Sequence, residues 1–317
     1  MEFKEKKRRG SFIATSCALA VFLSTLASAV AADEVRATPP AVLPTSVEIR
    51  ELEEASHPDT AEVVAAFSSA FEHQDKKVFI NSLAYDKTVI VREGVAYAEP
   101  VEFFSHFSNF ESSGDERSVI IAGEGFDFSA LADEKYVTAN GRCFYCPGGV
   151  VFEDGRLFVP VEAMAKAFSL DCREEQEEVS LSGECEPVLC AGEFYVDDDL
   201  YWLSRIISCE SMSESFEGKI AVGNVVLNRV CSAEFPPDVK GVVFDSRYGI
   251  IQFSPVRGGY IYNDPDPESV AAAKVCLEGV SLSDSILYFM NPALASTSWI
   301  SDNREAVMTI GHHTFYS

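Results

Sequence analysis

Basic residues are scarce in this sequence, in which 25 lysines and arginines face 50 aspartates and glutamates and give a formal net charge of -25. A protein this acidic repels phosphate backbones and anionic lipid headgroups, so nucleic acid is a poor partner. Histidine is scarcer still, because the chain has five and none lies between positions 107 and 311. Most of the sequence therefore offers no imidazole to a metal, and no cofactor is expected.

Long polar tracts and low-complexity repeats are missing as well. Hydrophobic residues make up 47% of the 317 residues and charged residues 24%, which excludes disordered and collagen-like chains. A chain of this length can bury a large core and is typical of about two domains.

The N-terminal residues have the pattern of an export signal. Residues 1–10 carry five basic side chains, and an apolar stretch then leads to the small residues Ala29-Val30-Ala31-Ala32. We expect residues 1–32 to be a cleaved signal peptide that directs the protein to the cell envelope. The alternative is an uncleaved anchor, since the stretch approaches the length of a membrane span. The membrane would then be a partner only through this segment.

Eight cysteines follow the predicted signal. An even number in an exported protein permits disulfides, but a core this large does not need them, so the pairing stays open. Cys143-x-x-Cys146 together with Cys185-x4-Cys190 imitates a four-thiolate zinc site. The second spacing is loose for zinc, so no metal site is predicted.

An internal repeat follows a predicted linker. Residues 33–57 are acidic and proline-bearing, without a sustained apolar period. In the predicted domain of residues 58–183, an offset of sixty places Pro100-Val101-Glu102 over Pro160-Val161-Glu162. Each unit predicts a strand, a tight turn, a strand, a proline-initiated helix and a short alternating strand. The tight turns are expected at Glu93-Gly94 and Asp154-Gly155.

Part of this segment resembles a known module. The triplet Asn140-Gly141-Arg142, the run from Gly155 to Val161 and the strand at Val179 resemble the stalk module named after the N-terminal domain of copper amine oxidases. The resemblance implies a spacer or a wall-contacting module. It does not imply copper, because the repeats offer so few histidines.

The remaining residues change in composition and predict helices. Residues 184–199 form a second predicted linker, and the domain of residues 200–317 follows it. Four aliphatic residues between positions 200 and 207 share one helical face, with Asp198 or Asp199 available as N-cap. A second helix over residues 216–230 is apolar on most faces and should be buried, with Ser213, or Ser211 in a capping box, at its start.

Glu210 lies where the first of these helices should end. The negative end of the helix dipole and the loss of solvent beside isoleucines both favour its protonated form, which a general acid needs. Raising its pKa from about 4.3 to about 6 requires roughly 2.3 kcal/mol, of which an exposed helix end supplies about 0.3 to 1. Desolvation must therefore contribute most of the shift. The alternative is an ordinary exposed residue at a helix end.

The residues around Glu210 and four later motifs follow a recognisable order: Phe235-Pro236, Gln252-Phe253-Ser254-Pro255, Leu287-Tyr288-Phe289-x-Asn291-Pro292 and Ile310-Gly311-His312-His313. In this order the C-terminal domain resembles the SleB-type spore-cortex-lytic enzymes, a cell wall hydrolase family. The resemblance implies an α+β protein with a lysozyme-like C-terminal domain. It also implies lytic transglycosylase activity on peptidoglycan glycan strands, with Glu210 as the catalytic residue and no second carboxylate.

The same resemblance suggests further site residues. Glu214 matches the family's second glutamate and would orient water or substrate, or else form a capping box. Asn228 would hold the loop of Glu210 or satisfy a buried backbone group, and His313 matches the family's histidine. Others would bind acetamido groups or line sugar subsites, although buried aromatic residues usually belong to a core: Gln252, Phe253, Ser254, Tyr288, Asn291 and Trp299.

Two departures from the family pattern leave other functions open. Met212 and Ser213 stand where family members have arginine and glycine, which restricts the backbone and removes a possible glycan contact. One alternative is therefore a catalytically impaired wall-binding or spore-surface protein. Another is a wall cysteine peptidase with Cys209 as nucleophile and His313 as base.

Overall fold

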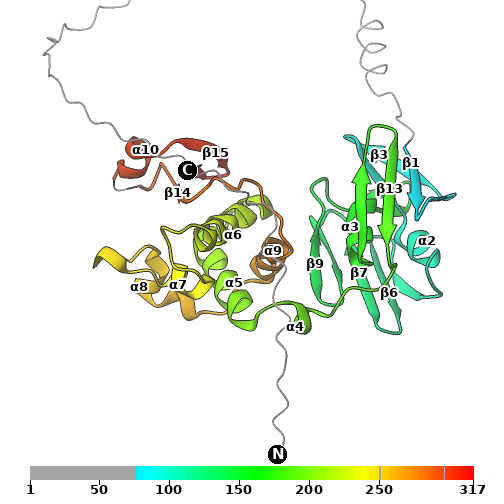
Figure 1. The fold of residues 1–317 in the computed structure, drawn as a ribbon, viewed down its shortest axis with the longest axis horizontal. Coiled ribbons are helices and arrows are strands. Elements are labelled where there is room, and N and C mark those ends of the chain that lie inside the picture. The colour runs from blue at the N-terminus through cyan, green and yellow to red at the C-terminus, as the bar shows by residue number, and fades with distance from the viewer. Residues whose placement is uncertain (1–75, 250, 296) are drawn as a thin grey trace, which may run out of the picture. The chain divides into compact units, whose positions relative to one another are not determined.

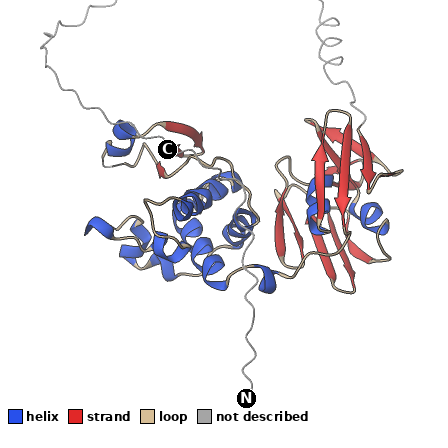
Figure 2. Ribbon diagram, viewed as in Figure 1, coloured by secondary structure: helices blue, strands red, loops and turns tan. Residues whose placement is uncertain are grey.

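The computed structural model describes residues 76–249, 251–295 and 297–317. The predicted signal peptide, the first linker and the start of the stalk-like domain lie outside these residues. Strands dominate the first part of the described chain, and helices with one small sheet make up the rest, which is an α+β arrangement (Figure 2). Among the described residues, no helix combines the length and the apolar character needed to cross a membrane.

One sheet brings together the first and last strands of the N-terminal part of the described chain. Strand β1 pairs in parallel with β13, so that Lys77 lies opposite Glu178. The sheet has the order β12-β13-β1-β2. Its strands are β1 (Lys77–Ile80), β2 (Leu83–Ala84), β12 (Leu170–Glu174) and β13 (Glu178–Gly183).

Two hairpins with glycine turns form a second sheet, of order β10-β11-β4-β3. Their strands are β3 (Val89–Arg92), β4 (Val95–Ala98), β10 (Val151–Glu153) and β11 (Arg156–Pro160). The expected turns are present, with φ of 50° and 81° at Glu93-Gly94 and of 50° and 75° at Asp154-Gly155. Positive φ at both central residues matches the twist of the flanking strands.

A helix follows each hairpin, as expected. These are α2 (Pro100–Ser105) and α3 (Val161–Ala167). Proline is the first residue of α2, but Pro160 still belongs to β11 and is the N-cap of α3. The second helix therefore starts one residue later than the repeat predicts.

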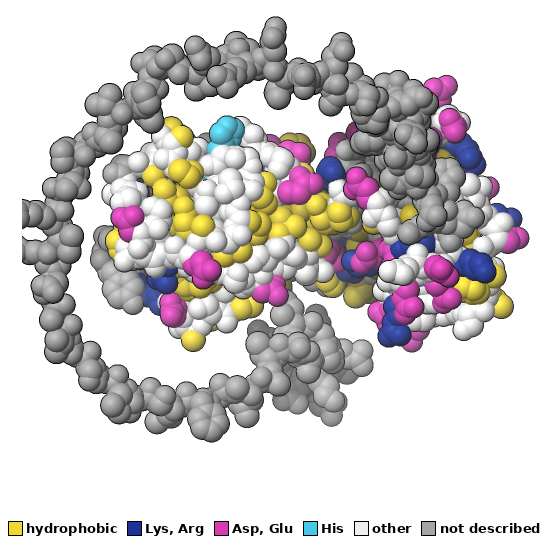
Figure 3. Space-filling model, turned by 90° about the horizontal axis from the view of Figure 1, so that it is seen from above, with side chains coloured by type: hydrophobic (Ala, Val, Ile, Leu, Met, Phe, Trp, Pro, Cys, Tyr) yellow, Lys and Arg dark blue, Asp and Glu magenta, His cyan; other side chains and the backbone are white. Residues whose placement is uncertain are grey.

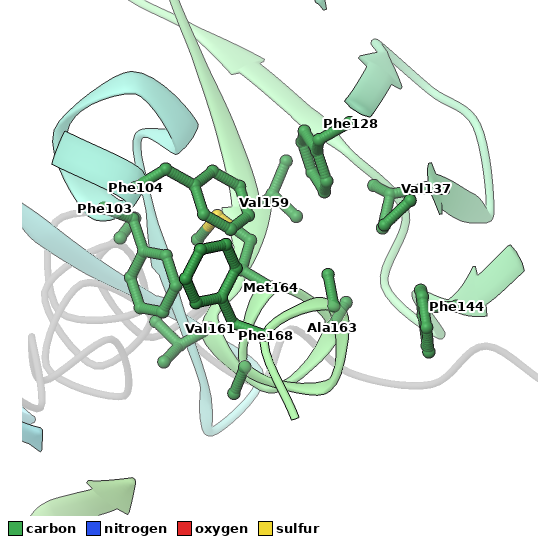
Figure 4. Packing of buried hydrophobic residues seen from close by; sticks show 14 of the residues in the cluster. Phe103, Phe104, Phe128, Val137, Phe144, Val159, Val161, Ala163, Met164 and Phe168 are labelled. Carbon is green, nitrogen blue, oxygen red and sulfur yellow. The ribbon is translucent and has the colours of Figure 1, made fainter. Parts of the chain in front are cut away.

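A five-stranded antiparallel meander completes the N-terminal part. Aromatic side chains fill the core beneath it, where the Phe104 ring lies 4.8 Å from that of Phe128 and 5.5 Å from that of Phe168 (Figure 4). The strands are β5 (Glu111–Asp115), β6 (Ser118–Gly123), β7 (Phe126–Leu131), β8 (Tyr136–Ala139) and β9 (Arg142–Tyr145).

Strand β9 contacts the helical part through a buried ion pair. Arg142 Nε donates to Glu278 Oε1 at 2.8 Å and its second amino group to Oε2 at 2.5 Å. The Tyr195 hydroxyl donates to the same Glu278 carboxylate at 2.6 Å. The segment predicted as a linker thus contains an ordered contact, along with helix α4 (Ala191–Phe194).

Three helices build the C-terminal core: α5 (Asp197–Ser211), α6 (Phe216–Cys231) and α9 (Pro267–Leu277) (Figure 1). Short elements surround them: α7 (Val239–Val243), η1 (Arg247–Gly249), α8 (Ser254–Gly258), η2 (Tyr260–Tyr262) and α10 (Trp299–Asn303). A sheet of order β14-β16-β15 ends the chain, with β14 (Tyr288–Met290), β15 (Ala306–Ile310) and β16 (His313–Tyr316).

The two predicted helices are confirmed, but their caps differ from the prediction. Helix α5 starts at Asp197 with Val196 as N-cap, so Asp198 and Asp199 lie in its first turn. Their negative charges interact favourably with the positive end of the helix dipole. Ser215 caps α6 by accepting the backbone N–H of Gly218, which replaces the caps predicted at Ser211 and Ser213.

Acidic side chains are spread over the one face of the molecule that Figure 3 shows. On the face shown in Figure 3, aspartates and glutamates are scattered among lysines and arginines. The negative charge of the chain is therefore spread out on this face rather than concentrated in one place.

Candidate active site

Glu210 is the penultimate residue of α5, so its side chain lies at the end of a buried helix. Burial raises the pKa of its carboxyl group from 4.5 to about 7, and desolvation is the cause of this shift. Within the described residues, no hydrogen bond or ion pair compensates for the lost solvent. The carboxyl group is thus held as a proton donor by its surroundings, as the energetic argument from the sequence required.

A buried lysine fixes the turn that follows Glu210. Lys219 Nζ donates to the carbonyl oxygens of Ser211, Met212 and Glu214 at 3.1, 2.9 and 3.2 Å. It also pairs with Glu268 Oε2 of α9 at 3.0 Å, and only 1% of its side chain is exposed. Carbonyl groups at a helix C-terminus lack partners within the helix, and this ammonium group supplies the missing hydrogen bonds. Its positive charge also interacts favourably with the negative end of the helix dipole.

Sequence reasoning missed Lys219, although a signal was available. A lysine that stands one residue before the apolar run of α6 has to be buried together with that run. The same turn shows why the missing glycine is tolerated, because Ser213, which stands at its position, does not have a positive φ. No residue between Ser211 and Ser215 has a positive φ.

Glu214 fastens the C-terminal hairpin to this turn. Its Oε2 accepts the backbone N–H of His312 at 3.0 Å, and its Oε1 lies 3.0 Å from the ring Nδ1 of the same residue. The carboxylate lies so close to Gly311 that a Cβ atom there would be 1.9 Å from Oε2. Glu214 is therefore a tether between two loops, and the capping-box alternative is wrong because Ser215 caps α6.

Glu210 and Glu214 have opposite pKa shifts. Burial raises the pKa of Glu214, but the backbone and ring hydrogen bonds of His312 outweigh it, and the net pKa is lowered. The site thus holds one carboxyl group that keeps its proton to about pH 7 and another that stays ionised. Environments that separate two pKa values in this way distinguish a proton donor from a fixed charge.

Cys209 and His313 do not form a nucleophile–base pair. The Cys209 thiol donates to the Tyr260 carbonyl oxygen at 3.4 Å, and burial raises its pKa, which keeps it protonated. His313 lies on β16 with its ring 5.2 Å from that of Phe289, and burial lowers its pKa. This geometry does not activate a thiol for peptidase chemistry.

Comparison with known proteins identifies the surroundings of this site. Residues 213–316 match the model of the family described as Cell Wall Hydrolase, a range that begins three residues after Glu210. We refer to residues 200–317, which contain this match, as the hydrolase domain. The rest of the chain, including Glu210 itself, lies outside that match.

Relatives of the hydrolase domain are spore cortex-lytic enzymes. That of Bacillus cereus is 35% identical over 121 residues, which are 38% of this chain and 45% of the enzyme. That of Bacillus subtilis is 32% identical over 121 residues, which are 38% of each chain. The chain therefore spans less than half the length of these curated relatives.

A solved structure is similar in the same region. The catalytic domain of the germination-specific lytic transglycosylase SleB from Bacillus anthracis is 34% identical to this chain. The similarity covers 39% of this chain and 97% of that domain, with a TM-score of 0.36.

Residues 252–254, which the sequence predicted to bind the glycan, lie partly in the core and partly on the surface. Phe253 is buried, with the Arg229 guanidinium 5.2 Å from its ring centre, so it is a core residue. Gln252 and Ser254 are exposed on either side of it. Only these two side chains of the stretch remain available to a ligand.

The aromatic candidates of the hydrolase domain gather around Arg304. Its guanidinium lies 4.4 Å from the ring centre of Tyr288 and 5.8 Å from that of Trp299, and it donates to the Tyr288 hydroxyl at 2.8 Å. Trp299 is 54% exposed. Asn291 accepts the N–H of Ala293 and so shapes the loop between these aromatic residues.

Asn228 satisfies buried backbone groups rather than the loop of Glu210. Its amide donates to the carbonyl oxygens of Ser283 and Ile286, each at 2.9 Å. It therefore fixes the segment that leads into β14.

The cysteines of the described chain carry free thiols. Cys143 and Cys146 are both buried, but Cys143 packs in the C-terminal core and Cys146 in the N-terminal one. No group of three or more metal-ligating side chains occurs within the ranges that the structure describes.

Proposed function

We propose that this chain is a secreted enzyme that cleaves the glycan strands of peptidoglycan as a lytic transglycosylase, acting on cell wall or spore cortex. The observation that carries the proposal is the desolvated carboxyl group of Glu210 at the end of α5, with a pKa near 7. The homology of the hydrolase domain to spore cortex-lytic enzymes supports the substrate class.

In the proposed reaction Glu210 acts twice. Its carboxyl proton passes to the glycosidic oxygen as the bond from C1 breaks, and positive charge develops on the sugar ring. The C6 hydroxyl oxygen of the same sugar then bonds to C1, and its proton passes to the Glu210 carboxylate. The product is a 1,6-anhydro sugar, and the enzyme regains its proton without a second carboxylate.

The other parts of the chain have supporting roles in this proposal. Residues 1–32 export the protein, and residues 58–183 form the stalk-like module that spaces the hydrolase domain or contacts the wall. Residues 200–317 have a lysozyme-like arrangement, in which the glycan binds beside Glu210. The tether from Glu214 to His312 keeps one wall of the site in place.

The experiment is digestion of purified sacculi and cortex with residues 33–317, followed by mass spectrometry of the fragments. Anhydro-muropeptides that disappear in Glu210→Gln are the expected result. Glu234→Gln makes the same chemical change at an exposed position of the same domain and serves as the control. Peptide-bond products lost in Cys209→Ser would indicate a peptidase, and binding without any product would indicate a wall-binding protein.

A further inference from the structure

Residues 260–266 are fastened along one face of the helix that carries Glu210. Cys209 Sγ donates to the Tyr260 carbonyl oxygen at 3.4 Å, and the Ser208 hydroxyl accepts the N–H of Asp266 at 3.3 Å. One turn earlier, Arg205 pairs with Asp264 at 3.0 Å. The three helix residues are spaced i, i+3 and i+4 and so share one face. The segment is therefore a fixed wall along the last two turns of α5.

This wall presents two tyrosine rings to solvent. Tyr260 is 64% exposed and Tyr262 is 61% exposed, whereas Ile261 between them is fully buried in the C-terminal core. The short helix η2 turns the two rings outward while Ile261 anchors them. Large side chains that are both exposed and anchored in this way indicate a binding surface.

Both rings are held in position. The Tyr260 ring lies against Gly258, where an added Cβ atom would come within 2.7 Å of it. The Tyr262 ring meets Trp202 at 6.1 Å between centroids and Phe244 at 6.4 Å. A ring that is already ordered loses little conformational entropy when a ligand stacks on it.

The segment that carries the two rings contacts α5 at two points on the way to Glu210. The backbone carbonyl of Tyr260 accepts the thiol of Cys209, the neighbour of Glu210, and the Tyr262 ring contacts Trp202, seven residues before Cys209 on α5. Seven residues of helix span about 10 Å. The two contact points on α5 therefore lie farther apart than the length of a single sugar, and the first of them is next to Glu210.

We propose that Tyr260 and Tyr262 form a glycan shelf, a site that binds consecutive N-acetylhexosamine rings on one side of the bond that Glu210 cleaves. Apolar faces of sugar rings stack on tyrosine rings, and the two hydroxyl groups reach the polar substituents. Two rings are too small a surface for a stable protein partner, which needs about 1,200 Å² or more. The shelf rests on the proposed function and adds chain-length selectivity to it.

The first test separates the shelf from catalysis. Binding to purified sacculi is measured with Glu210→Gln protein that also carries Tyr260→Ala and Tyr262→Ala. We expect about tenfold weaker binding than with Glu210→Gln alone. The double change to phenylalanine keeps the ring faces and should restore binding to within about twofold. Leu83→Ala, at a residue 65% exposed in the N-terminal part, should have no effect.

The second test uses the active protein. The double alanine variant should raise KM for long glycan strands about tenfold and change kcat much less, because the shelf binds ground state and transition state alike. The effect should be smaller on a disaccharide-length substrate. Circular dichroism and thermal unfolding confirm that each variant is folded.

The outcomes distinguish the two proposals. If the unaltered protein forms no anhydro product, the proposed function fails, and sacculus binding still decides whether the shelf exists. If binding and KM stay unchanged in the folded double alanine variant, the shelf is overturned. Equal losses in the alanine and phenylalanine variants would also overturn stacking as its basis.

Discussion

The N-terminal and C-terminal halves of the described chain bury different kinds of residue. Twelve polar or charged residues are buried in the described chain, and ten of them lie in the C-terminal part. The N-terminal core is filled by aliphatic and aromatic side chains. Burying a polar group costs free energy unless it is bonded, so a fold retains such groups chiefly where they position something. The buried polar groups of the described chain are thus concentrated in the C-terminal half, where the proposed chemistry lies.

The largest expected effect tests whether the C-terminal half holds the chemistry, by removing the carboxyl proton of Glu210. Glu210→Gln should lower the rate of glycan cleavage by about 10² to 10⁴, because a general acid contributes on that order. The measurement is the initial rate of anhydro-muropeptide release, with Glu234→Gln as the matched control. A rate within tenfold of the unaltered protein would show that the buried carboxyl group is not the acid.

The same residue predicts how stability depends on pH. Its pKa is about 7 in the folded protein against an ordinary 4.5, so the folded state binds a proton that the unfolded state has lost between these values. Stability should fall as pH rises from about 4.5 to about 7, by up to about 3 kcal/mol. Glu210→Gln should remove this decline in urea unfolding curves. Parallel curves for the two proteins would contradict the raised pKa.

Lys219 tests whether buried charge in the C-terminal half is structural. Lys219→Met leaves three carbonyl groups without their donor and Glu268 without its partner, so we expect a loss of about 2–4 kcal/mol in the free energy of unfolding. Lys166→Met is the control, because Lys166 pairs with Glu162 at an exposed site of the N-terminal half and should lose about 0.5 kcal/mol or less. Similar losses of unfolding free energy for both variants would show that the buried charge of the C-terminal half is no more important for stability than the exposed pair.

The smallest effect is expected at the tether. Glu214→Gln and His312→Ala should show a coupling of about 1 kcal/mol in a double-mutant cycle. The pKa of Glu214 is lowered in the folded protein, so its contribution is present at neutral pH and is lost as pH falls through that lowered value. The measurement is urea unfolding of the four proteins at pH 7 and pH 3. Additive effects at both pH values would show that the contact is dispensable.

Local patterns predicted much of the fold. The apolar periods gave helices that match α5 and α6, and the Glu-Gly and Asp-Gly pairs marked hairpin turns that are present with positive φ. These features depend on neighbours in the sequence, which are visible without a structure. Whether Glu210 is buried or exposed at the end of its helix stayed open in the sequence, and the desolvation of its carboxyl group is seen only in the structure.

Other features depend on residues far apart in the chain. The bond from Glu214 to His312 joins positions 98 residues apart, and that from Arg142 to Glu278 joins positions 136 apart. The shelf tyrosines have no local pattern that distinguishes them from a core pair. The burial of Lys219 could have been predicted from the apolar run that follows it, but its three carbonyl partners are known only once the turn is placed in space.

The parallel pairing of β1 with β13 has a consequence for how the protein is made. The strand that opens the described chain lies beside one that ends at Gly183, so its edge stays open until about a hundred further residues have been supplied. During synthesis from the N-terminus, the unpaired edge of β1 is open to pairing with other strands throughout this interval. Closing the sheet is therefore a late step, and the module is most vulnerable to aggregation during its own synthesis.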